Sequence, residues 1–166
     1  MQYEKLRYQP NKLSQLLTVL GMAFMTFALF KVINVYRYVS TTTSGIINPS
    51  MSIGFEILIA VGIMLISFLA SEKFKSYDYK WGFVGIGLTA YPIVKIFIFP
   101  LSLNKTMIQL KEAGQVLKVN PTTWLWTVII SLIISAVFYG LATTIAIIRN
   151  NQLRQYYKEL NSSDAN

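Results

Sequence analysis

The chain has 166 residues, of which 54% are hydrophobic and 13% are charged, and its formal net charge is +8. Soluble domains carry about 25% charged residues, so this composition indicates a single membrane domain rather than a nucleic-acid-binding protein. The sequence has no cysteine and no histidine, which excludes disulfides, thiolate chemistry, His-ligated haem and Ser–His catalysis. We therefore expect no catalytic residue, no metal site and no cofactor.

Four apolar stretches predict membrane-spanning helices. They cover residues 13–36, 52–71, 82–103 and 122–148. Each reaches the roughly 20 residues that a helix needs to cross a hydrocarbon core about 30 Å thick. The sequence therefore predicts an all-α, four-helix transmembrane bundle with up-down-up-down topology and short loops.

Prolines and an asparagine mark the expected helix ends. Asn11 follows Pro10 and is suited to cap the first helix. Pro100 is expected to end the third helix, because proline interrupts the backbone hydrogen bonds of a helix interior. Pro121 is expected to open the fourth helix, where a missing N–H costs nothing.

Two amphipathic segments are predicted to flank the spans. In residues 104–118, apolar residues recur at helical spacing opposite charged ones, which is typical of an interfacial helix at the outer membrane surface. In residues 149–160, Leu153, Tyr156 and Leu160 lie on one helical face. This segment predicts a cytoplasmic extension of the fourth helix.

The distribution of basic residues predicts the orientation. Nine lie in the N-terminal segment, the second loop and the C-terminal segment: Lys5, Arg7, Lys12, Lys73, Lys75, Lys80, Arg149, Arg154 and Lys158. Four lie in the first and third loops: Arg37, Lys105, Lys111 and Lys118. The positive-inside rule then places both termini in the cytoplasm, where the basic residues also contact anionic lipid.

Three charged residues fall at one depth of the predicted bundle. Lys31, Glu56 and Lys95 lie on three different helices, each a few residues from the outer end of its span. Because a charge within a span is costly unless it is paired, the pattern predicts an intramembrane polar cluster. Asn34 and Tyr91, one helical turn from the two lysines, are expected to contribute hydrogen bonds to it.

The cluster admits three interpretations. The lysines can extend to the outer headgroups or pair with Glu56 for purely structural reasons. The cluster can also pair with a partner subunit, or it can bind a ligand, a lipid headgroup or an ion. The sequence leaves all three open.

Small hydroxyl residues form a stripe on the fourth span. Thr127, Ser131 and Ser135 recur at every fourth position, which is typical of a face that packs closely against another membrane helix. No continuous polar stripe is evident through the inner leaflet, where only Thr26 and Ser67 stand out. A pore would need such a stripe.

The stretches "YQPNKLSQLL" and "SEKFKSYDYKW…IFIFPL" resemble uncharacterised four-helix membrane proteins of low-GC bacteria, including mollicutes. That resemblance implies a bacterial plasma membrane and, for some such proteins, association with larger transport systems. The missing catalytic motifs, together with the intramembrane charges, the packing stripe and the two amphipathic flanks, favour a non-enzymatic accessory or scaffold subunit that contacts lipids and other membrane subunits. The alternative is a small oligomeric transporter or channel that uses Lys31, Glu56 and Lys95.

Overall fold

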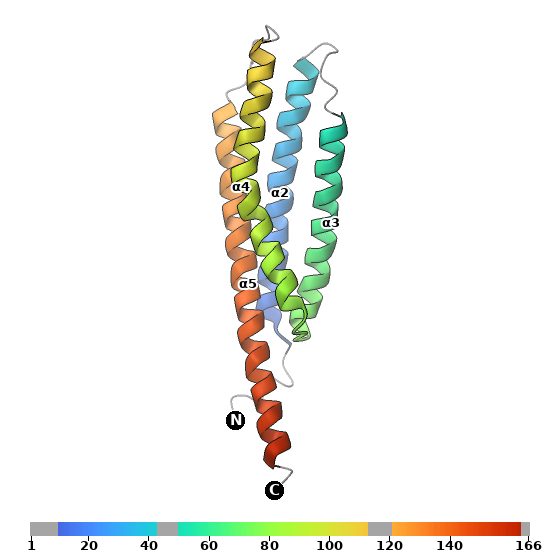
Figure 1. Cartoon of the computed structure of the whole chain (residues 1–166), viewed down its shortest axis with the longest axis vertical. Coiled ribbons are helices and arrows are strands. Elements are labelled where there is room, and N and C mark those ends of the chain that lie inside the picture. The colour runs from blue at the N-terminus through green and yellow to red at the C-terminus, as the bar shows by residue number, and fades with distance from the viewer. Residues whose placement is uncertain (1–9, 43–49, 113–120, 164–166) are drawn as a thin grey trace.

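The computed structural model describes residues 10–42, 50–112 and 121–163, and these form four helices (Figure 1). The helices are α2 (Lys12–Thr42), α3 (Ser50–Lys75), α4 (Trp81–Glu112) and α5 (Pro121–Ser163). Each contains a segment long and apolar enough to cross a membrane: Lys12–Ile33, Gly54–Lys75, Trp81–Leu101 and, within α5, Leu125–Ser162. The predicted all-α class with four membrane-spanning helices is confirmed.

The chain alternates in direction from one helix to the next, as the colours in Figure 1 show. We call the end where α2 and α4 begin the lower end. There the backbone N–H of Asn11 donates to the carbonyl of Lys75 at 3.1 Å, which joins the start of α2 to the end of α3. Helices α2 and α3 are therefore joined at the lower end by a backbone hydrogen bond.

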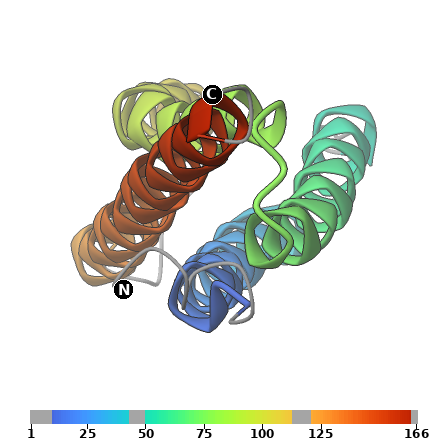
Figure 2. The same cartoon turned by 90° about the horizontal axis from the view of Figure 1, so that it is seen from below.

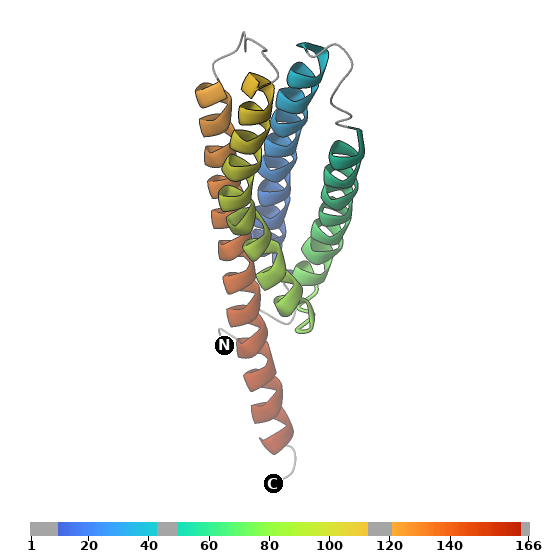
Figure 3. The ribbon, with the colours of Figure 1, turned by 45° about the horizontal axis from the view of Figure 1, so that its top comes forward.

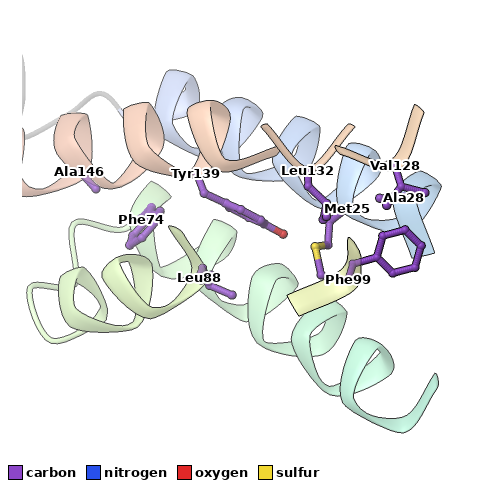
Figure 4. Packing of buried hydrophobic residues seen from close by; sticks show 10 residues of the cluster. Met25, Ala28, Phe74, Leu88, Phe99, Val128, Leu132, Tyr139 and Ala146 are labelled. Atoms are coloured by element: carbon purple, nitrogen blue, oxygen red, sulfur yellow. The ribbon is translucent and has the colours of Figure 1, made fainter. Parts of the chain in front are cut away.

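The core includes a narrow inward stripe on α2 and another on α5, with residues three or four positions apart. On α2 the stripe consists of Ser14, Thr18, Gly21, Met25 and Ala28, and on α5 of Val128, Ser131, Ser135, Tyr139, Ala142 and Ala146, all of which are buried. Figure 4 shows the buried hydrophobic members of this core, which also come from α3 and α4. A spacing of three and four lets helices pack at a shallow angle along their whole length.

Helix α4 does not end where the sequence suggested. Pro92 and Pro100 both lie inside it, so the expectation that Pro100 ends the third helix is wrong. Figures 1 and 3 show α4 bending along its length instead, as prolines that remove a backbone hydrogen bond cause. Residues 104–112 continue α4 rather than starting a separate helix, and residues 113–118 of the predicted interfacial helix lie outside the described part.

The turn between α3 and α4 is closed by a hydrogen-bonded helix terminus. The Asp78 N–H donates to the Lys73 carbonyl at 3.1 Å and the Tyr77 N–H to the Phe74 carbonyl at 3.3 Å. Tyr77 itself has a φ of 59°. This is the Schellman arrangement, in which a left-handed residue, usually glycine, ends the helix. It fixes α3 firmly at its lower end.

Helix α5 is far longer than a bilayer requires. Its 43 residues span about 64 Å at about 1.5 Å per residue, roughly twice the hydrocarbon thickness. As expected, it begins at Pro121, and the segment 149–160 continues it without a break. Figure 1 shows this extension projecting beyond the lower ends of the other helices. The Arg154 guanidinium lies 4.6 Å from the ring centroid of Tyr79, which ties the extension to the turn before α4.

Candidate functional site

Glu56 and Lys95 form an ion pair between α3 and α4. Lys95 Nζ donates to both carboxylate oxygens of Glu56, at 2.6 and 2.7 Å. Both residues occupy inward positions, because Glu56 precedes buried Ala60 by four residues and Lys95 precedes buried Phe99 by four. On α3 and on α4, a charged residue thus occupies an inward position where an apolar residue would be expected.

The pair lies near the upper ends of the apolar spans. Its side chains remain 20% (Lys95) and 30% (Glu56) exposed, on the side where α3 and α4 diverge. Pairing lowers the cost of placing two charges among apolar neighbours, and the two bonds to one carboxylate satisfy both oxygens. The arrangement is a neutral ion pair with partial access from outside the bundle.

A small cavity lies behind the ion pair, and all four helices line it. It has a volume of about 30 Å³, which is room for one or two water molecules. Its lining consists of Met25, Ala28, Leu29, Val32, Glu56, Tyr91, Lys95, Phe99 and Leu132. Tyr91 also lies beside the pair, with its ring centroid 5.9 Å from Lys95 Nζ. The cavity is therefore mostly apolar, with its polar groups on α3 and α4.

The structure separates Lys31 from this cavity. Ala28 and Val32 occupy the lining positions of α2, whereas Lys31 lies beside that stripe with its Nζ 5.2 Å from the ring centroid of Phe27. Of the predicted cluster, the structure therefore brings Glu56, Tyr91 and Lys95 together around the cavity. The side chain of Asn34 lies outside the described part.

The hydroxyl stripe of α5 faces α2. Ser135 Oγ donates to the carbonyl of Gly21 at 2.8 Å, a hydrogen bond between the two helices. Ser131 is buried and donates to the carbonyl of Thr127 at 2.8 Å, within its own helix. Thr127 is only half-buried, because the adjacent Val128 takes the inward position and is completely buried. The contact face is thus rotated slightly from the predicted stripe.

Tyr139 extends that face and was not singled out from the sequence. Its hydroxyl lies 2.7 Å from Ser67 Oγ of α3, and its ring packs directly on Gly21 of α2, where a Cβ would lie 3.0 Å from the ring. Tyr139 follows Ser135 by four residues, so extending the predicted stripe by one more step of four would have found it. It connects three helices at the middle of the bundle.

Asn11 performs a similar role at the lower end. Its Oδ1 accepts a hydrogen bond from Arg149 Nη1 at 2.9 Å and a longer one from the Ser14 backbone N–H at 3.5 Å. The second contact is the helix cap that the sequence predicted. The first was not foreseen, because nothing in a single sequence indicates that Arg149 returns to the start of α2.

The lower half holds more buried hydroxyl groups than the sequence suggested. Besides Ser67, the buried residues include Ser14, Thr18, Ser71 and Thr143. Ser14 Oγ donates to the carbonyl of Ala142 on α5 at 2.6 Å, and Thr18 Oγ1 donates to the carbonyl of Ser14 at 2.8 Å. The first of these bonds joins α2 to α5, whereas the second lies within α2. They do not by themselves form a path for ions.

Within the described residues, no group of three or more acidic, histidine or cysteine side chains is placed to hold a metal ion. By length and composition of its helices, the chain is a multi-pass membrane protein. Comparisons with protein-family models, curated proteins and solved structures give no match. Any more specific function has to be argued from the ion pair and its surroundings.

Proposed function

We propose that this protein is a non-enzymatic accessory or scaffold subunit that binds a larger membrane assembly, such as a transporter, in a bacterial plasma membrane. The observation that carries the proposal is the Glu56–Lys95 ion pair, partly exposed where α3 and α4 diverge. A polar pair in this position offers a partner helix a specific contact within otherwise uniform apolar surface. The basic lower end is expected on the cytoplasmic side.

The outer surface of α3 supports the same proposal. Phe55, Leu58 and Ile59 flank Glu56, and their side chains are 63%, 69% and 44% exposed. Lipid alone is compatible with such a surface, so exposure does not distinguish lipid from protein contacts. The ion pair can distinguish them, because a partner protein that contacts the pair should bind differently when the charge of Glu56 is removed.

Photo-crosslinking in native membranes tests this proposal. A photoreactive amino acid is placed at Leu58, beside the ion pair, and for comparison at Ile133, an exposed residue of α5 that is 46% exposed. We expect a discrete protein adduct from position 58 and none from position 133. The adduct should disappear when Glu56→Gln is added. Only lipid adducts at position 58, or a protein adduct that Glu56→Gln does not affect, would contradict the proposal.

The second candidate is a small oligomeric transporter or channel. It is favoured by the cavity, because residues from all four helices line it and two of them carry charge. Its volume of about 30 Å³ is small for a transport path. Purified protein in liposomes separates the two candidates, since a transporter should produce ion or solute flux that Glu56→Gln changes, whereas an accessory subunit alone should produce none.

A further inference from the structure

Helix α3 is held very differently at its two ends. In its lower half, Ser67, Ala70, Ser71 and Phe74 are at most 2% exposed. The lower half is fixed further by the Ser67–Tyr139 hydroxyl contact and by the Asn11 N–H that donates to the Lys75 carbonyl. This end of α3 is part of the tightly packed core.

The upper end of α3 has little comparable packing. From Gly54 to Ile59 every residue is exposed except Glu56, which is partly buried. Figures 1 and 2 show α3 leaning away from the other helices toward this end. Between Gly54 and Ile59, Glu56 is the residue that is not exposed, and it makes the ion pair with Lys95.

We propose that α3 is an arm hinged at its lower half and latched at its upper end by the Glu56–Lys95 ion pair. Release of the latch separates the upper parts of α3 and α4. The cavity behind the ion pair then opens sideways, toward the bilayer. The cavity lies directly behind the pair, and both charged residues line it. The latch is a property of the chain itself and needs no partner subunit.

An ion pair suits this task better than an apolar contact at the same place. Glu56 lies two residues from the upper end of the span Gly54–Lys75, and Lys95 lies six residues from the end of Trp81–Leu101. Once separated, each side chain can reach the nearby headgroup region. The open state therefore avoids burying two isolated charges, so closed and open arrangements can differ by little free energy.

Distance measurements between spin labels test the latch in purified protein in nanodiscs. The chain has no cysteine, so pairs of cysteines can be introduced without removing any. One pair, Leu58→Cys with Val94→Cys, reports on the upper end, and a second, Leu69→Cys with Ile86→Cys, reports on the lower end. All four native side chains are at least half exposed, which keeps the labels out of the core.

With Glu56→Gln, we expect the upper distance to lengthen and broaden while the lower distance stays as in the wild type. The exchanged pair Glu56→Lys with Lys95→Glu should restore the short upper distance, because it re-forms the ion pair with reversed polarity. An unchanged upper distance in folded Glu56→Gln would overturn the latch. Lengthening at both ends, or a failure of the exchanged pair to restore the distance, would overturn the hinged arm.

Discussion

The two halves of this bundle use polar residues in opposite ways. In the lower half, several short hydroxyl side chains are buried and bond to carbonyls between helices, as when Ser14 donates to Ala142 and Ser135, nearer the middle, to Gly21. In the upper half, two full charges pair across α3 and α4 and remain partly exposed. The first kind of contact needs helices to touch closely, whereas the second reaches across a wider separation.

This difference indicates a fixed base below an adjustable top. Close contact depends on glycines and on small residues, which let helix backbones approach and make many weak contacts at once. A single ion pair is one contact that can be lost in one step.

The two ends should lie on opposite sides of the membrane. We expect a cysteine at Ser162, at the lower end of α5, to be protected from an impermeant thiol reagent in intact cells, because the lower end carries most of the basic residues. A cysteine at Ile108, in the upper part of α4, should be labelled at once. Labelling of position 162 with protection of position 108 would reverse the orientation.

Among the described glycines, Gly85 on α4 has the least room for an added side chain. A Cβ at this position would lie 2.4 Å from Thr143 Oγ1 and 2.7 Å from Phe74 Cζ. The buried Thr143 hydroxyl oxygen has no hydrogen-bond partner among the described residues. Gly85→Ala should lower the free energy of unfolding by about 3 kcal/mol through overpacking.

Gly87→Ala is the matched control for Gly85. It lies two residues away on the same helix, and a Cβ there meets nothing within 4 Å. Alanine should then be neutral or stabilising by up to about 1 kcal/mol, because it restricts the unfolded chain more than glycine does. Equal unfolding free energies for the two variants, measured by titration with a denaturing detergent, would show that α4 and α5 do not pack closely at Gly85.

In the upper half, a double-mutant cycle should detect the ion pair. Glu56→Gln, Lys95→Met and the double variant are compared by unfolding in nanodiscs. We expect a coupling of about 2 kcal/mol, less than for a fully buried pair because the Lys95 and Glu56 side chains remain 20% and 30% exposed. Glu56→Gln alone should be worse than the double variant, since it leaves Lys95 without its counter-charge. A coupling below about 0.5 kcal/mol would mean that Lys95 reaches the headgroups independently.

The sequence was sufficient to predict the ion pair of Glu56 and Lys95, but not to predict which other residues line the cavity beside it. Length and composition predict four spans, and the depth of Glu56 and Lys95 along those spans predicts that they meet. Depth alone also groups Lys31 with them. What separates Lys31 is its direction around the α2 axis, since Ala28 and Val32 face the cavity instead. That direction follows from helix packing, which no single residue encodes.

The prolines show a second limit of local reasoning. Pro100 has the local chemistry of a helix terminus, yet α4 continues to Glu112. A membrane helix can bend at proline and continue, because neighbouring helices stabilise the remaining hydrogen bonds. Likewise, the stripe of Thr127, Ser131 and Ser135 assumes a constant spacing of four, whereas packing mixes spacings of three and four and places Val128 inward in place of Thr127.

The contact between Gly21 and Tyr139 lies between the two halves and should show a smaller effect. A Cβ on Gly21 would lie 3.0 to 3.2 Å from three atoms of the Tyr139 ring, and a ring can shift by a few tenths of an ångström. Gly21→Ala should therefore cost about 1 kcal/mol of unfolding free energy. Gly62→Ala on α3, where nothing lies within 4 Å, is the control and should not be destabilising.

The smallest effect is expected at the hydroxyl of Tyr139. Tyr139→Phe removes the contact with Ser67 Oγ, 2.7 Å away, but keeps the ring that packs on Gly21. Ser67 Oγ also contacts the carbonyl of Ile63 at 2.7 Å, so the serine keeps a partner and no polar group is left isolated. Hydrogen bonds between membrane helices contribute about 0.6 kcal/mol on average, and we expect a loss of that size.

The companion variant Tyr139→Leu separates the ring from the hydroxyl. It removes both, opens a cavity beside Gly21, and should cost several times as much as Tyr139→Phe because buried aromatic volume is lost. If the base of the bundle depends on close packing, the ring must matter more than the hydroxyl. Unfolding free energies that fall equally for both variants would instead assign the stability of this contact to the hydrogen bond, and the contrast between a packed base and a charge-latched top would no longer hold.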